Sequence, residues 1–203
     1  MNRVVELERT HLKPDDLTFI NDLEFTAKLS TLLKQPDEES LLEELLAVKI
    51  KSFGPNHERV AYTEITLAIC YMVQKKFADA ESLCKKSLET RLKNFKEPHI
   101  LIAESYHNLG TALADQKKYE EALTNLERAW FNAQSLAGTN SVLEAKNTYL
   151  KAKSMHGLRK DGADAAARKS LELAIATFGE DDAGTIRARE LLKAVEADEG
   201  PKP

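Results

Sequence analysis

The stretch Gly54-Pro55-Asn56-His57-Glu58-Arg59-Val60-Ala61 returns further along the chain as Lys96-Glu97-Pro98-His99-Ile100-Leu101-Ile102-Ala103. A shift of 42 residues places His57 on His99 and Ala61 on Ala103. The same shift places the segment 74–77, Gln-Lys-Lys-Phe, on the segment 116–119, Gln-Lys-Lys-Tyr. Self-similarity at a fixed period of about 20 to 50 residues is typical of proteins built from stacked repeats. The sequence therefore predicts a repeat architecture.

The content of one period is clearest in residues 96–137. Two segments each carry small, aliphatic and aromatic residues at helical spacing on one face. In the first segment these residues are Tyr106, Leu109, Gly110 and Leu113, and in the second they are Tyr119, Ala122, Leu126 and Ala129. Gly110 and Ala122 are small where two helices must approach closely, and the aromatic residues are large where the gap must be filled. Each repeat is therefore predicted to be a helical hairpin with a short polar turn.

This order of an aromatic residue, Leu-Gly, a second aromatic residue and Ala resembles the tetratricopeptide repeat. The link with its His and Ala, and the segment 80–89, resemble the kinesin-light-chain type of this repeat over residues 54–137. The resemblance implies an all-α, right-handed superhelical array, an α-solenoid, with a concave groove that binds other proteins. It does not imply transport, because the heptad-rich coiled coil expected of kinesin light chains is not in this sequence.

The repeats are expected to form one domain, 1–198, and its first and last repeats diverge from the pattern. Glu38 stands where Ala80 and Ala122 stand, and the fourth repeat is one residue short, with the segment 156–162 expected to replace the usual turn. The helix expected at 2–11 fits either a cap or the end of a repeat in a longer protein. The expected parts are repeats at about 12–53, 54–95, 96–137 and 138–179, terminal helices at about 2–11 and 182–197, and a disordered tail at 199–203.

Composition excludes several classes of function. The 203 residues carry a net charge of −4 with both signs interspersed, which argues against nucleic-acid binding and against a basic membrane-binding patch. No stretch is apolar and long enough to cross a bilayer, and the N-terminus has no apolar signal core, so a cytoplasmic location is expected. Cys70 and Cys84 are expected to be reduced thiols that pack as small apolar residues.

The sequence contains no catalytic or metal-binding motif, so no enzyme activity, cofactor or metal site is predicted. His57 and His99 are related by the repeat, and a residue copied once per repeat is more typical of stacking than of catalysis. A carboxylate-binding clamp needs several cations inside the groove, and only Lys146 and Lys153 of repeat four could contribute, at one end.

The first helix of repeat two carries apolar residues on the face that should be polar. Ala61, Leu67 and Ala68 face the partner helix, yet the opposite face is also apolar. A helix that is apolar nearly all round is buried by something, and in tetratricopeptide arrays this second face lines the groove. In repeat three the groove candidates are mostly polar. The resemblance implies that Asn108 holds a ligand backbone, which an amide suits because it can donate and accept, and a solvated Asn108 is the alternative.

The sequence therefore predicts non-catalytic binding of a peptide or helix with apolar anchor side chains. The predicted groove residues are Ile20, Leu23, Ala27, Tyr62, Ile65, Ile69, Met72, Val73, His107, Asn108 and Thr111. The apolar patch could be covered by a partner peptide, by a second copy of the chain in a homodimer, or by the chain's own N-terminal segment. A regulatory or sensory module of a larger multidomain protein is the alternative function.

Overall fold

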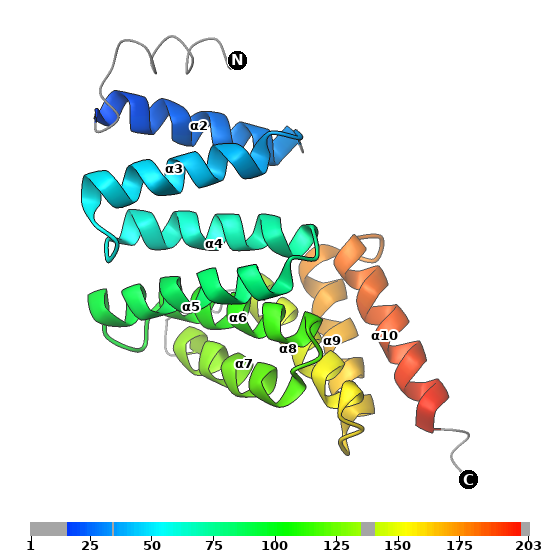
Figure 1. Ribbon diagram of the computed structural model, residues 1–203. Coiled ribbons are helices and arrows are strands. Elements are labelled where there is room, and N and C mark those ends of the chain that lie inside the picture. Colours follow the sequence, from blue (N-terminus) through cyan, green and yellow to red (C-terminus); the bar gives the residue numbers. More distant parts are fainter. Residues whose placement is uncertain (1–15, 34, 135–140, 200–203) are drawn as a thin grey trace. The chain divides into compact units, whose positions relative to one another are not determined.

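The structure is a computed structural model that describes residues 16–33, 35–134 and 141–199. These residues form helices joined by turns, without a strand, which confirms the predicted all-α fold class (Figure 1). The predicted helix at 2–11 and residues 200–203 of the predicted tail lie outside the described residues. The helices are α2 (Leu17–Leu33), α3 (Glu38–Phe53), α4 (Glu58–Val73), α5 (Phe77–Asn94), α6 (Ile100–Asp115), α7 (Tyr119–Gln134), α8 (Ser141–Gly157), α9 (Ala163–Phe178) and α10 (Ala183–Glu199).

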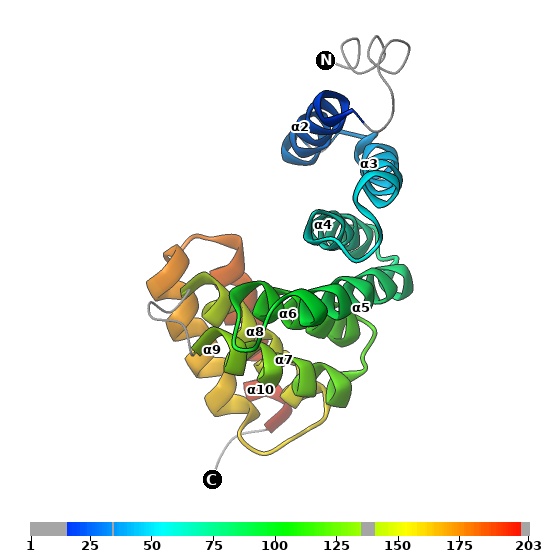
Figure 2. The same cartoon turned by 90° about the vertical axis from the view of Figure 1, so that its left-hand side faces the viewer.

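The helices group into two compact units, residues 1–94 and 95–203, called unit 1 and unit 2 below. In unit 1, α2 packs against α3, α3 against α4, and α4 against α5. In unit 2, α6 packs against α7, α7 against α8, α8 against α9, and α9 against α10, and α8 also contacts α6 and α10 (Figure 2). Contacts between neighbours and next neighbours are typical of stacked hairpins. The assignment of residues 1–198 to one repeat domain stays a prediction.

The histidines of the two links are helix caps. His57 and His99 precede α4 and α6, and each Nδ1 accepts a hydrogen bond from the backbone N–H two residues further on, at 3.1 and 3.2 Å. Each ring also stacks on the phenylalanine four residues earlier, with ring centroids 5.0 Å apart for Phe53 and 4.2 Å apart for Phe95. A side-chain acceptor at this position satisfies a backbone donor that has no partner inside the helix. The prediction that these histidines are structural is confirmed.

The turn inside each hairpin is repeated as well. Lys75, Lys117 and Arg159 follow one another at intervals of 42 residues and have positive φ angles of 62°, 62° and 52°. The residue after each of them donates its backbone N–H to the carbonyl five residues earlier, which closes the preceding helix. The expectation that 156–162 replaces the usual turn is therefore wrong for its first half. Arg159 keeps the turn, and α9 begins at Ala163 instead of 161, so two residues are inserted after it.

Gly110 lets α6 and α7 approach closely, as predicted. A Cβ atom added to Gly110 would lie 2.9 Å from the side chain of Leu126 and 3.5 Å from the backbone oxygen of Ala122. Both neighbours are buried, so neither can move without disturbing the packing around it. The glycine is thus required by the distance between the two helices.

We predict that His99→Ala lowers the free energy of unfolding by about 1–2 kcal/mol, because it removes the cap hydrogen bond and the ring stacked on Phe95. His99→Asn restores a side-chain acceptor without the ring and should recover part of the loss. Urea unfolding followed by circular dichroism measures both variants. Equal stability of His99→Ala and the wild-type protein would contradict the prediction.

Candidate functional site

The second apolar face predicted for α4 is partly exposed in the structure. Tyr62 and Ile69 expose 46% and 45% of their surface, and Val73 exposes 80%. At 100° per residue these three side chains lie within about 40° of one another on the helix, so they form one stripe. We call Tyr62, Ile69 and Val73 the α4 stripe. Met72 lies half-buried beside it.

Four of the predicted groove residues are buried and offer no open surface. Ile20, Leu23 and Ala27 of α2 are fully buried, and Ile65 of α4 is nearly so. The prediction that these four side chains line a groove is not supported by their burial in the structure. They are interior residues of unit 1.

The physical reason for the error in α2 is a shift in register. The bond that closes α2 runs from the Gln35 N–H to the Ser30 carbonyl, whereas a 42-residue interval from the α4 turn would place it between 34 and 29. A shift of one residue turns every face of a helix by about 100°. The positions equivalent to 62, 65 and 69 of α4 are then Asn21, Glu24 and Lys28, which are polar.

These polar side chains of α2 lie beside the α4 stripe. The Lys28 Nζ is 5.6 Å from the centroid of the Tyr62 ring and pairs with Glu24 at 2.8 Å. A hollow of about 430 Å³ opens here, lined by Glu24, Lys28, Lys49, Glu58, Arg59 and Tyr62. The candidate site in unit 1 is therefore an apolar stripe with charged residues of both signs at its edge.

A buried cation holds the helices together under this hollow. The Lys49 ammonium, with only 1% of the residue exposed, donates to the Thr63 hydroxyl at 3.1 Å and pairs with Glu24 at 2.8 Å. Burial lowers the pKa of Lys49, and the Glu24 carboxylate opposes that shift. Removing one partner of such a pair leaves the other charge buried and uncompensated, which is strongly destabilising.

The same position of the next repeat also holds a buried cation. Arg91 lies 42 residues after Lys49, is equally buried, and pairs with Glu58 of α4 at 3.0 Å. The sequence reasoning missed both residues, although the period places one on the other. Two cations at one repeat position, near the end of the second helix of each hairpin, were the signal that could have found them.

Glu64 of α4 is a buried carboxylate. It exposes 5% of its surface, and its Oε2 atom makes no hydrogen bond. Burial raises the pKa of Glu64 to about 7, although the charges of Lys86 and Arg91 on α5 act in the opposite direction. The 42-residue interval places Glu64 on Tyr106, so a carboxylate occupies the position of a packing aromatic residue. A direct comparison of these two positions would have revealed it.

In unit 2 the predicted polar groove residues make bonds within the fold. His107 is buried, and its Nδ1 lies 3.3 Å from the Oδ1 of Asn147 on α8. Burial lowers the pKa of His107 to about 4, so the ring is neutral at pH 7. His107 thus joins α6 to α8 and does not line a groove. Asn108 and Thr111 stay partly exposed and bond to the backbone of Glu104 and His107, at 2.8 and 2.9 Å.

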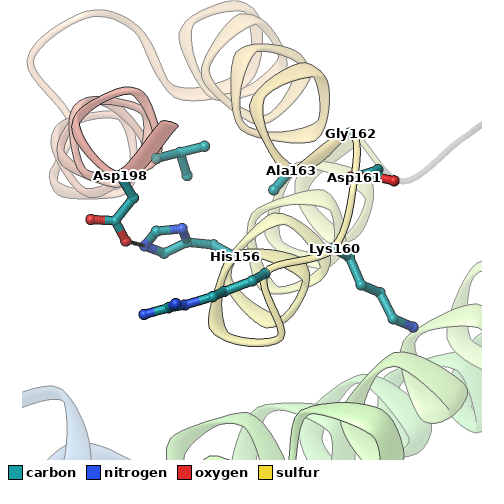
Figure 3. A pocket seen from close by; sticks show the side chains of 8 residues that line it. His156, Lys160, Asp161, Gly162, Ala163 and Asp198 are labelled. Carbon is teal, nitrogen blue, oxygen red and sulfur yellow. Dashed lines mark ion pairs between the residues drawn. The ribbon is translucent and has the colours of Figure 1, made fainter. Parts of the chain in front are cut away.

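A hollow of about 360 Å³ lies at the long turn between α8 and α9 (Figure 3). His156 of α8 and Asp198 of α10 face one another in it, with Nε2 and Oδ2 3.6 Å apart, while the Lys160 side chain extends away from the pair. The lining contains no serine, threonine or cysteine that the histidine could activate. The pair therefore does not form the arrangement of a nucleophilic catalyst.

The two cysteines fit the predicted structural role. Cys70 and Cys84 are free thiols and both are buried. Burial raises the pKa of Cys84 to about 12, which disfavours the reactive thiolate. Within the described part of the chain, no group of three or more His, Cys, Asp or Glu side chains is placed to share a metal ion. No described helix has both the length and the apolar character needed to cross a membrane.

We predict that Glu64→Gln stabilises the protein at pH 8 much more than at pH 4.5. The carboxyl group ionises near 4.5 in the unfolded chain and near 7 in the folded one, so wild-type stability falls as the pH rises through that interval. The difference corresponds to about 3 kcal/mol, which the glutamine removes. Urea unfolding of both proteins at the two pH values measures it.

The matched control for this variant is Glu190→Gln, at an exposed position on α10. It should change the free energy of unfolding little. A Glu64→Gln effect that is the same at both pH values would show that burial of the charge is not its cause.

The sequence profile of the tetratricopeptide repeat family matches residues 59–129. A protein of Podosopora anserina assigned as a kinesin light chain with nearly identical TPR-like repeats has a similar structure, with a TM-score of 0.69 at 16% identity over 93% of this chain and 89% of that chain. A single-substitution variant of that protein gives a TM-score of 0.70 at 17% identity, over 94% and 90%. BtubC (BKLC) from P. vanneervenii gives 0.71 at 20% identity, over 82% of this chain and 66% of that chain.

No curated protein matches the sequence. The structural matches agree with the sequence profile and with the hairpins, caps and turns that recur at 42 residues. Residues 59–129 are therefore tetratricopeptide repeats, and the chain is a repeat protein with the α-solenoid fold of kinesin-light-chain-type repeats.

Proposed function

We propose that the protein is a non-catalytic scaffold that binds a peptide or helix of another protein through the α4 stripe. The observation that carries the proposal is the exposure of Tyr62, Ile69 and Val73 along one face of α4. Exposed apolar side chains gathered on one face mark interaction sites more often than scattered ones do. Tetratricopeptide repeats and a kinesin-light-chain-like fold support a role in protein interaction.

The surroundings of the stripe have the usual anatomy of an interface, an apolar centre with a polar rim. The apolar centre is the α4 stripe, and the rim beside Tyr62 is formed by Lys28, Glu24 and Arg59. Covering one large apolar side chain contributes on the order of 1.5–3 kcal/mol to binding. A partner with bulky apolar anchor side chains fits this surface.

We predict that the double variant Ile69→Asp with Val73→Asp stays folded and loses at least about 100-fold in affinity for its partner. Both side chains are exposed, so the new carboxylates remain in water, while two apolar contacts with the partner are lost. Affinity capture from native extract, followed by binding measurements with the captured protein, gives the affinity. Ile65 is unsuitable for this test because it is buried.

A matched control replaces one isoleucine and one valine of unit 2, Ile186→Asp with Val142→Asp, which expose 44% and 42% of their surface. This control should keep the partner. Sedimentation of all three proteins tests the alternative that a second copy of the chain covers the stripe. In that case the wild-type protein and the unit 2 control would be dimers, and the α4 double variant would be a monomer. A folded α4 variant with undiminished binding and unchanged mass would refute the role of the stripe.

A further inference from the structure

A hollow of about 380 Å³ lies in unit 2 among α7, α8 and α9, and its exposed lining is mostly apolar. Leu126 of α7 and Ala166 and Leu173 of α9 supply apolar lining. Trp130 of α7 forms part of the wall, exposes 39% of its surface, and is the single tryptophan of the chain. The hollow belongs to unit 2, whereas the α4 stripe belongs to unit 1.

The buried polar side chain in the lining of the hollow, Asn147, already has hydrogen-bond partners within the fold. The Asn147 Nδ2 of α8 donates to the Leu126 carbonyl of α7 at 2.9 Å, and its Oδ1 lies 3.3 Å from the His107 Nδ1. A buried amide that already has partners does not attract water or a polar ligand. The hollow is therefore a preformed apolar pocket, of the kind that accepts a side chain or small apolar group.

Opposite charges stand at the two ends of this pocket. Glu144 and Lys151 of α8 both line it, and seven residues place them on one helix face about 10 Å apart along the axis. Neither forms an ion pair with any residue that the structure describes. Glu127 of α7 and Lys169 of α9 are further lining residues, and Lys169 pairs with Glu172 at 3.4 Å. The pocket thus takes its apolar lining from α7 and α9, and its α8 side is acidic at one end and basic at the other.

We propose that this pocket docks an extended protein segment of the pattern basic–x–apolar–x–acidic, with its bulky apolar side chain beside Trp130. In an extended chain, side chains two residues apart point to the same side, and the first and fifth lie about 13 Å apart. That span fits charges about 10 Å apart on α8, since lysine and glutamate side chains bridge the difference. The basic residue meets Glu144, the acidic residue meets Lys151, and the apolar residue fills the centre.

The charge layout favours this segment over other occupants. A purely apolar ligand would leave both rim charges unused, and a segment with one sign of charge would meet repulsion at one end of the pocket. Tryptophan is enriched among the residues that contribute most to protein interfaces, which fits the place of Trp130 in the wall.

The single tryptophan gives a direct test, because its fluorescence reports on this pocket alone. Twelve-residue peptides with the cores Lys-Ser-Leu-Ser-Glu and Lys-Ser-Ala-Ser-Glu are titrated into the full chain. The leucine peptide should shift the Trp130 emission to shorter wavelength in a saturable manner, and the alanine peptide should bind at least about 10-fold more weakly. No saturable shift, or equal binding of both peptides, would overturn the proposal.

A charge reversal tests the rim separately. Glu144→Lys makes both ends of the α8 face basic, so the preferred peptide should change from Lys-Ser-Leu-Ser-Glu to Glu-Ser-Leu-Ser-Glu, with each affinity moving about 10-fold. The control Glu190→Lys, on an exposed site of α10, adds the same charge and should keep the original preference. Circular dichroism establishes that both variants are folded. A Glu144→Lys protein that still prefers the leucine peptide of mixed charge would also overturn the proposal.

Discussion

A hydrogen bond from the first turn of a helix to the preceding histidine ring, made twice at an interval of 42 residues, fixes where two of the hairpins begin. Each ring also stacks on the phenylalanine four residues earlier, which is the last residue of α3 for His57 and lies in the link before α6 for His99. Within each hairpin, the left-handed residue of the turn closes the first helix at the same interval. Because a single hairpin cannot bury its apolar face alone, the spacing set by these two devices decides which side chains meet in the core.

The two units use different chemistry inside this common frame. Unit 1 buries charge, with the cations Lys49 and Arg91 and the carboxylate Glu64 inside it. In unit 2, α8, α9 and α10 enclose a cluster of small apolar side chains, Ala152, Ala163, Ala167 and Val195. A buried ion pair contributes little to the net free energy of unfolding, but removing one of its partners lowers that free energy strongly. Small apolar residues instead allow two helices to approach closely. The two units therefore share a repeated backbone but are stabilised by different interactions.

The period allowed the hairpins, the structural role of the two link histidines and the close approach at Gly110 to be predicted, because each depends on residues near in sequence or one period apart. That these histidines cap helices was found only in the structure. The burial of Ile20, Leu23 and Ala27 was missed since it depends on a one-residue shift that only the hydrogen bond at the end of α2 reveals. The Trp130 pocket has no periodic signature. Three helices of two different repeats build it, so its lining residues are scattered through the sequence and meet only in the folded chain.

The one-residue shift of α2 shows how a repeat protein can change which residues stand on a helix face without substituting any of them. Moving α2 and its closing bond together by one position relative to the 42-residue interval places Asn21, Glu24 and Lys28, instead of the apolar residues 20, 23 and 27, at the positions equivalent to 62, 65 and 69, and the hairpin still forms. Insertion or deletion of a single residue thus changes all the residues of a helix face at once, whereas a point substitution changes one side chain. The two residues added before α9 are an insertion in a turn of this same kind, and the fold accommodates them too.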